Sequence, residues 1–135
     1  MKKYNCTLVV DDDPISCFIN QKIIELSNIT DHIAIVHNGW EALEYISNNL
    51  SHNRGFSAKS DLILLDLNMP VMNGFEFLEK FESWEQGFRD NIEVVVLTSS
   101  NSQSDIERVK AFDVKSYLSK PLTIEGLKSL FKTYP

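Results

Sequence analysis

The chain has 135 residues, of which 43% are hydrophobic and 24% charged, so it is long enough for one domain whose core needs no disulfides or structural metal. Thirteen basic and nineteen acidic residues give a net charge of −6, and no stretch concentrates lysine or arginine, which argues against nucleic acid or an anionic membrane as a partner. No apolar stretch approaches the ~20 residues that a membrane span needs.

The beginning of the chain and its cysteines predict a cytoplasmic protein. The apolar run after the two first lysines ends in acidic residues too early to be a signal-peptide core. Cys6 and Cys17 have no CxxC or metal-ligand spacing, so we interpret both as reduced core residues. We expect one domain over residues 1–135, without an effector domain.

Short β-branched runs alternate with segments of helical periodicity along the chain. The polar stretches 51–60 and 85–91 are interpreted as surface loops. In chain order, the predicted elements are a strand at 6–10, a helix at 14–28 with apolar residues at helical spacing (Ile15, Phe18, Ile19, Ile23, Leu26), a strand at 32–37, a helix at 39–50, a strand at 61–67, a helix at 74–84, a strand at 92–98, a helix at 104–112, a strand at 116–119 and a helix at 124–134.

Five strand–helix units predict an α/β fold, a doubly wound parallel sheet with helices on both faces. The runs LVV, LILL and VVVL are continuously apolar, as expected for strands that are buried on both faces. Ligands of such sheets bind beyond the carboxyl ends of the strands. The residues at these ends are therefore the candidates for function.

Acidic residues gather where the predicted strands end. Asp11 and Asp12 follow the first strand, Asp66 lies at the end of the third, Thr98 ends the fourth, and Lys120 follows the fifth. Carboxylates that repel one another are tolerated beside a hard divalent cation with oxygen ligands, which suits Mg²⁺. With the metal beside it, Asp66 can act as a nucleophile toward phosphorus and form an aspartyl phosphate, while Lys120 and Thr98 contact the phosphoryl oxygens.

The third acid of the DDDP stretch has a simpler interpretation. Asp13 precedes Pro14, and an aspartate followed by proline is typical of a helix N-cap and the first helical position. We therefore predict that Asp13 caps the helix at 14–28 and is not a metal ligand.

Five motifs together make the chain resemble the receiver domain of two-component response regulators. They are LVVDDDP, NGWEAL, DLILLDLNMPVMNGFEFL, VVVLTSS and SYLSKPL, which occur in the family's order and approximate spacing over nearly the whole chain. The resemblance implies a flavodoxin-like five-stranded parallel sheet of order 2-1-3-4-5 with five helices.

Carried over residue by residue, the resemblance makes Asp66 the phosphoacceptor. Asp12 matches the acid that binds Mg²⁺ directly, and Asp11 matches its partner, which often acts through water. Asn68 matches the residue whose backbone carbonyl binds the metal, so the implied ligands are Asp11, Asp12, Asp66 and this carbonyl. Mn²⁺ can substitute for Mg²⁺ in such a site.

Further positions of the family pattern surround this site. Thr98 and Lys120 match the hydroxyl and the ammonium that contact the phosphoryl group, and the Lys120–Pro121 bond is cis in the family. Tyr117 matches the aromatic residue that switches rotamer. Asp113 stands where the family usually has glycine, a position of left-handed backbone, and Ser100 lies where the residue influences access of hydrolytic water.

The function implied is that of a stand-alone receiver, a signalling domain that catalyses only its own phosphorylation and dephosphorylation. It accepts a phosphoryl group on Asp66 from a histidine kinase or a histidine phosphotransfer protein. The face made by the helix at 104–112, the strand at 116–119 and the helix at 124–134 then changes its affinity for a downstream protein. Some residues of this region are expected to lie mostly in the core and partly at that surface, namely Ile106, Val109, Leu122 and Leu127. We expect a monomer or a weak phosphorylation-dependent dimer.

Two other functions are considered. DDDP contains an Asp-x-Asp that resembles the first motif of haloacid-dehalogenase-type phosphatases, which would make Asp11 the nucleophile of a Mg²⁺-dependent enzyme. The chain has no cap domain and no acidic pair after Lys120, which argues against this. The other alternative is a pseudo-receiver that keeps the fold as an interaction domain without phosphorylation.

Overall fold

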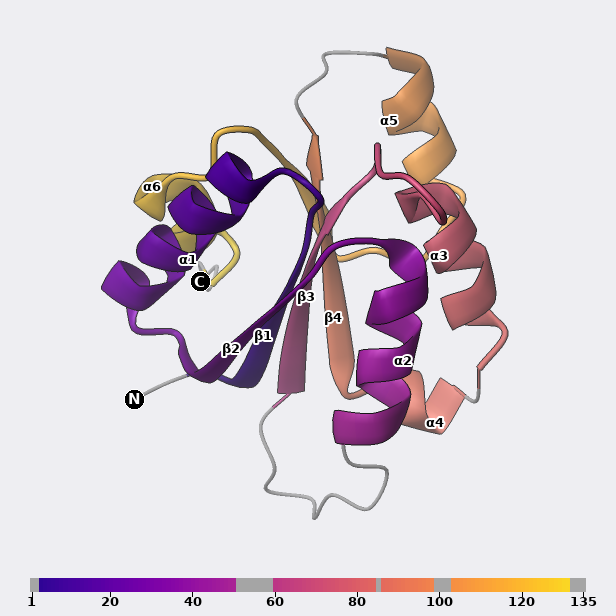
Figure 1. The fold of residues 1–135 in the computed structure, drawn as a ribbon, viewed down its shortest axis with the longest axis horizontal. Helices are drawn as coiled ribbons and strands as arrows, with labels where there is room; N and C mark the ends of the chain where they lie inside the picture. The colour runs from indigo at the N-terminus through magenta and orange to yellow at the C-terminus, as the bar shows by residue number, and fades with distance from the viewer. Residues whose placement is uncertain (1–2, 51–59, 85, 99–102, 132–135) are drawn as a thin grey trace, which may run out of the picture.

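A five-stranded parallel sheet lies between two layers of helices in the computed structural model, which describes residues 3–50, 60–84, 86–98 and 103–131 (Figure 1). The strand order is β2-β1-β3-β4-β5, so the predicted flavodoxin-like topology is confirmed. No helix within these ranges is long and apolar enough to cross a membrane. The strands are β1 (Tyr4–Val10), β2 (Thr30–Val36), β3 (Ser60–Asp66), β4 (Ile92–Thr98) and β5 (Ser116–Ser119).

The described helices number six, one more than predicted, although all five predicted helices are present. They are α1 (Pro14–Ser27), α2 (Gly39–Asn49), α3 (Gly74–Glu82), α4 (Gln86–Arg89), α5 (Gln103–Val109) and α6 (Ile124–Ser129). The extra helix, α4, lies within 85–91, where a loop was predicted. This turn packs locally: the ring centroids of Phe88 and Trp84 are 5.9 Å apart, and Arg89 Nε donates to the Trp84 carbonyl at 3.0 Å. The loop predicted at 51–60 falls outside the described residues except for Ser60.

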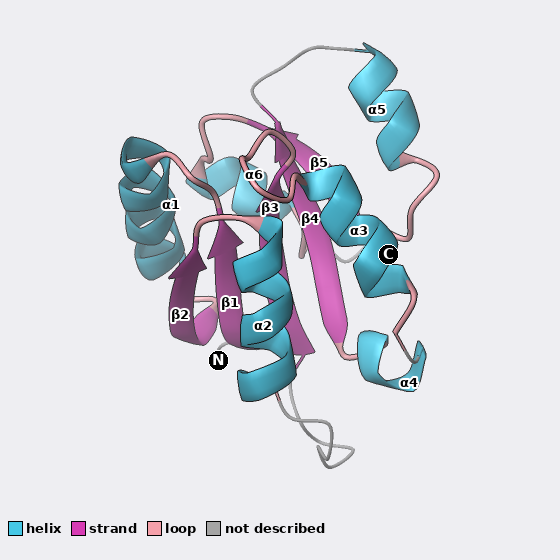
Figure 2. Cartoon of the chain, turned by 45° about the vertical axis from the view of Figure 1, so that its right-hand side comes forward, coloured by secondary structure: helices cyan, strands magenta, loops and turns pink. Residues whose placement is uncertain are grey.

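Two hydrophobic clusters hold the sheet, one on each face. Alternate residues of a strand point to opposite faces, so Leu62 and Leu64 join the cluster under α1 and α6, and Ile63 and Leu65 join the cluster under α2, α3 and α5. Figure 2 shows these helices on the two sides of the sheet. Burial on both faces explains why the central strands are continuously apolar.

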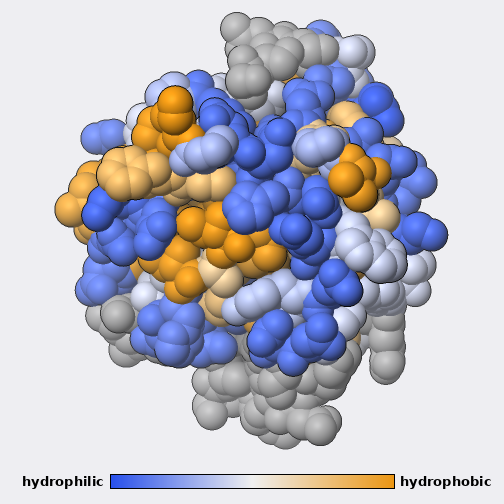
Figure 3. Space-filling view, in the orientation of Figure 1, coloured by the Kyte–Doolittle hydropathy of each residue, from blue (hydrophilic) through white to orange (hydrophobic). Residues whose placement is uncertain are grey.

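Helix α1 is where the apolar pattern and the buried face disagree. The side chains of Ile15, Phe18 and Leu26 are 70%, 63% and 70% exposed, whereas the buried residues of the helix include Asn20 and Ile24. Apolar surface accordingly lies over α1 at the left of Figure 3. The helix therefore packs on the sheet through a narrow seam and leaves its apolar stripe at the surface.

The structure also describes the helix cap, the backbone at Asp113 and the two cysteines. Asp13 caps α1 as predicted, since its side chain accepts a hydrogen bond from the Ile15 amide and Pro14 begins the helix. Asp113, at the family's glycine position, does not have a left-handed backbone, and its amide donates to Glu82 Oε2 at 2.6 Å. Both cysteines are buried and free, and burial, with the charge of Asp11, raises the pKa of Cys17 to about 11.

Candidate functional site

Three carboxylates meet at the carboxyl edge of the sheet. β1 and β3 are neighbours with Val10 beside Leu65, so the residues that follow β1 lie level with Asp66 at the end of β3. One carboxylate oxygen from each of Asp11, Asp12 and Asp66 lies within 4.8 Å of the others. Asp11 and Asp66 are buried, and Asp12 is exposed. The structure thus brings the predicted acids together in one crevice.

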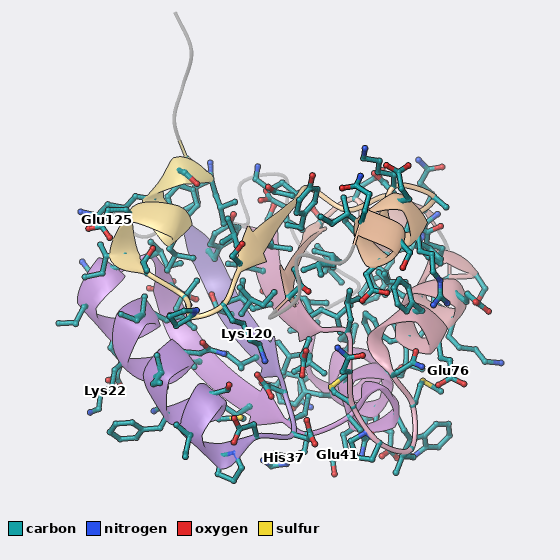
Figure 4. All side chains as sticks on the ribbon, turned by 90° about the horizontal axis from the view of Figure 1, so that it is seen from above. Lys22, His37, Glu41, Glu76, Lys120 and Glu125 are labelled. Atoms are coloured by element: carbon teal, nitrogen blue, oxygen red, sulfur yellow. The ribbon has the colours of Figure 1, made fainter. Side chains whose placement is uncertain are left out.

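Lys120 reaches into this crevice from the loop after β5. Its Nζ lies 2.9 Å from Asp11 Oδ2 and 3.5 Å from Asp66 Oδ2. Its backbone amide donates to the Thr98 carbonyl at 2.8 Å, and the Lys120–Pro121 peptide bond is cis as predicted. Figure 4 looks onto this edge and shows Lys120 pointing to the middle of the site, while Glu76 and Glu125 lie at the periphery.

The charges of the site remain unbalanced. Burial raises the pKa of Asp66 and the charge of Asp11 raises it further, against the opposing effects of Lys120 and the Asn68 amide. Burial alone would lower the pKa of Lys120, but its hydrogen bond to Asp11 and the charge of Asp66 outweigh burial, so the pKa is raised. Lys120 is therefore charged at neutral pH and offsets only one of three neighbouring carboxylates.

The oxygen atoms of this cluster fit a divalent cation. Asp11 Oδ1 accepts the Asp13 amide at 3.0 Å, so Asp11 is held on both of its oxygens, while Asp12 is open to solvent. The Asn68 amide donates to Asp66 Oδ1 at 3.3 Å, which keeps the backbone of Asn68 beside the carboxylates. A hard cation that takes carboxylate, carbonyl and water oxygens, as Mg²⁺ does, matches this set of donors.

Sequence reasoning missed Gly74, which fixes the loop between β3 and α3. Its amide donates to the Leu67 carbonyl at 3.0 Å, and a Cβ on Gly74 would lie 2.7 Å from the Asp66 carbonyl oxygen. The loop also turns sharply at Val71, whose φ of 68° is rare for a β-branched residue. The sequence signal for this position was the pair Asn73–Gly74 before an apolar helix. Asn73 and Glu76 form a capping box, so α3 begins at Gly74.

The predicted hydroxyl and the predicted aromatic switch lie on adjacent strands. Thr98 is buried at the end of β4, and Tyr117 on β5 is 42% exposed. Both residues line one small pocket together with Ile106 and Val109. Core positions are confirmed for Val109, Leu122 and Leu127, whereas Ile106 is only partly buried. Ser100 lies outside the described residues.

Comparisons with known proteins show which family the chain resembles. The model of the "Response regulator receiver domain" family matches residues 7–132. "Probable methanogenesis regulatory protein FilR2" of Methanothrix harundinacea is 34% identical over 121 residues, which cover 90% of this chain and 75% of that protein. Response regulator Rcp1 of Synechocystis is 30% identical over 125 residues, covering 93% of this chain and 80% of that protein.

Solved structures lead to the same family. A two-component response regulator from Cytophaga hutchinsonii superposes with a TM-score of 0.82 at 32% identity, covering 96% of each chain. The bacteriophytochrome response regulator RtBRR superposes with a TM-score of 0.74 at 27% identity, covering 98% of this chain and 81% of that one. With the family match, the fold and the acidic crevice taken together, this chain belongs to the response regulator receiver family of two-component signalling.

Proposed function

We propose that the protein accepts a phosphoryl group on Asp66 from a histidine kinase or a histidine phosphotransfer protein. The observation that supports this most is the position of Lys120 Nζ, 3.5 Å from Asp66 Oδ2 and 2.9 Å from Asp11 Oδ2. An ammonium at this place stabilises negative charge that develops on a phosphoryl group bonded to Asp66. The pKa of Lys120 is raised, so its ammonium group is protonated at neutral pH.

In the transfer, an Asp66 carboxylate oxygen attacks phosphorus, the new P–O bond forms, and the P–N bond to the donor's imidazole breaks. Lys120 offsets the charge on the phosphoryl oxygens, and the Thr98 hydroxyl donates a hydrogen bond to one of them. Asp11, Asp12, Asp66 and the Asn68 carbonyl would hold the metal, for which Mn²⁺ can substitute. Bound Mg²⁺ supplies positive charge that shields the phosphorus from the three carboxylates.

The response is a population shift in the region where Thr98 and Tyr117 share one pocket. When Thr98 moves toward the phosphoryl group, Tyr117 turns inward and the surface of α5, β5 and α6 changes its affinity for a downstream protein. We propose that this protein acts in the cytoplasm as a single receiver domain, binds a protein and not nucleic acid, and is a monomer or a weak dimer when phosphorylated.

A phosphatase that uses Asp11 as the nucleophile is disfavoured by the contacts of that residue. Asp11 is 1% exposed, and its two oxygens accept bonds from Lys120 and from the Asp13 amide. Both oxygens of Asp11 therefore already accept hydrogen bonds, which disfavours Asp11 as a nucleophile toward phosphorus. Asp66 is also buried, but its Oδ2 lies 3.5 Å from Lys120 Nζ, a longer contact than the 2.9 Å between Lys120 and Asp11.

Intact-mass measurement after incubation with Mg²⁺ and acetyl phosphate tests the proposal. The wild type should gain one phosphoryl group, and Asp66→Asn should gain none. Asp13→Asn, which makes the same chemical change at the helix cap, is the matched control and should be labelled. Absence of the adduct where a known receiver is labelled would identify a pseudo-receiver. Catalytic phosphate release that survives in Asp66→Asn and is lost in Asp11→Asn would identify the phosphatase.

A further inference from the structure

Asn20 is a polar residue on the buried seam of α1. It is 3% exposed, and its Nδ2 has no hydrogen-bond partner among the residues that the structure describes. The buried residues on either side of it along the seam are Cys17 and Ile24. A buried donor without a partner destabilises a protein by about 1–3 kcal/mol, so an amide at this position calls for an acceptor.

The amide lies at a pocket that also contains the lysine of the site. The pocket has a volume of about 190 Å³, and its walls come from α1 on one side and the loop after β5 on the other. It is large enough to hold water, for which about 15 Å³ suffices. The lining residues are Ser16, Ile19, Asn20, Lys120 and Pro121.

The wall across from Asn20 offers acceptors and no free amide hydrogen. The Lys120 amide already donates a hydrogen bond to the Thr98 carbonyl at 2.8 Å, and Pro121 has no amide hydrogen. The remaining polar main-chain atoms of these two residues are their carbonyl oxygens, which accept hydrogen bonds. On the α1 side, the Ser16 hydroxyl already donates a hydrogen bond to Asp13 Oδ2 at 3.2 Å. The Nδ2 group of Asn20 is thus the donor that complements these carbonyls.

We propose that Asn20 is a positioning residue for Lys120, with its amide donating across the pocket, through one water, to the carbonyl oxygens of the Lys120–Pro121 segment. Lys120 Nζ can lie 2.9 Å from Asp11 and 3.5 Å from Asp66 only if its main chain is held in place. Asn20 therefore supports the phosphorylation of Asp66 without touching it. This inference rests on the proposed phosphoryl transfer to Asp66.

The test compares phosphorylation rates with acetyl phosphate and Mg²⁺, followed by intact mass. Asn20→Leu keeps the size of the side chain and removes the donor, so the rate on Asp66 should fall about three- to tenfold, as for one lost hydrogen bond. The melting temperature of this variant should stay close to that of the wild type, because leucine fills the same buried space. Ile19→Ala removes an apolar part of the same pocket, is the matched control, and should change the rate less than twofold.

Two further variants separate positioning from packing. In a Lys120→Ala background, followed for as long as its slower reaction requires, Asn20→Leu should change the residual rate less than twofold. Asn20→Ser keeps a donor and should recover part of the rate. The inference is overturned if Asn20→Leu is phosphorylated at the wild-type rate, if its effect persists without Lys120, or if Asn20→Ser loses as much rate as Asn20→Leu. A wild type that is not labelled on Asp66 would instead refute the proposed function.

Discussion

Replacing Asp66 by asparagine should stabilise the fold when no divalent cation is present. At an effective dielectric of ~20, a carboxylate of Asp11 within 4.8 Å repels that of Asp66 by at least about 3.5 kcal/mol. Lys120 at 3.5 Å attracts it by about 5 kcal/mol. Asp12 adds up to ~3.5 kcal/mol of repulsion, reduced by its exposure, and Asp66 also loses hydration by burial. The net effect of ionised Asp66 is destabilising, and we expect Asp66→Asn to add about 1–2 kcal/mol to the free energy of unfolding.

Thermal unfolding by circular dichroism in EDTA measures this gain, which corresponds to a rise in melting temperature of roughly 3–8 °C for a domain of this size. Asp13→Asn is the control, since asparagine also caps a helix, and its stability should stay within about 0.5 kcal/mol of the wild type. With saturating Mg²⁺ the gain should shrink or reverse, because Asp66 then faces a cation and its removal deletes a ligand.

The pH dependence of the gain follows from the raised pKa of Asp66. The folded state holds the proton at pH values where the unfolded state has released it, so the stability of the wild type falls as pH rises from the unfolded pKa, about 4, through the folded one. Asp66→Asn lacks this loss. Its advantage should therefore grow as pH rises and should narrow as pH falls toward 4. A variant that melts below the wild type in EDTA at pH 7, or whose gain grows in acid, would refute this account of the site.

Three other variants probe the same edge of the sheet. Lys120→Met should act in the opposite sense to Asp66→Asn and lower the free energy of unfolding by about 3 kcal/mol in EDTA, because buried carboxylates lose their cation; urea unfolding measures this, and unchanged stability would contradict the ion pairs. Gly74→Ala should lower stability by about 1–3 kcal/mol, since its Cβ would meet the main chain of Asp66 and Leu67 at 2.7–2.8 Å, and a normal melting temperature would exclude this close packing. Asp13→Ala should cost about 1 kcal/mol in urea unfolding through the lost helix cap, an effect that Asp13→Asn should not show.

The sheet and the acidic crevice were predictable because each depends on one repeated signal. Apolar runs mark strands that are buried on both faces, and parallel strands bring their carboxyl ends to a single edge. Asp11, Asp66 and Lys120 therefore had to meet, although they lie far apart along the chain. The cap at Asp13 was equally local, since an aspartate before proline needs no tertiary contact to begin a helix.

Tertiary contacts override the local pattern at two places. The apolar spacing of Ile15, Phe18 and Leu26 is that of a buried stripe, yet the packing of α1 leaves these residues exposed and buries Asn20. Spacing can show that a helix is amphipathic but not which face the sheet selects. At Asp113 the family's glycine suggested left-handed backbone, whereas a hydrogen bond from its amide to Glu82, 31 residues earlier, accompanies a different conformation. Such a contact has no trace in the neighbouring sequence.

Several features that weaken this fold lie near the carboxyl edge of the sheet. Clustered carboxylates lie beside one lysine, the β-branched Val71 adopts a φ of 68°, and Asn20 leaves a buried donor without a described partner. The rest of the described sheet is covered by two apolar clusters. A chain selected for stability alone would place leucine at Asn20 and glycine at Val71, so the concentration of unfavourable groups around Asp66 is itself an argument that this edge binds and reacts. The predicted gain on removing the Asp66 charge is the measurable form of that argument, because a purely structural aspartate would destabilise the protein when lost.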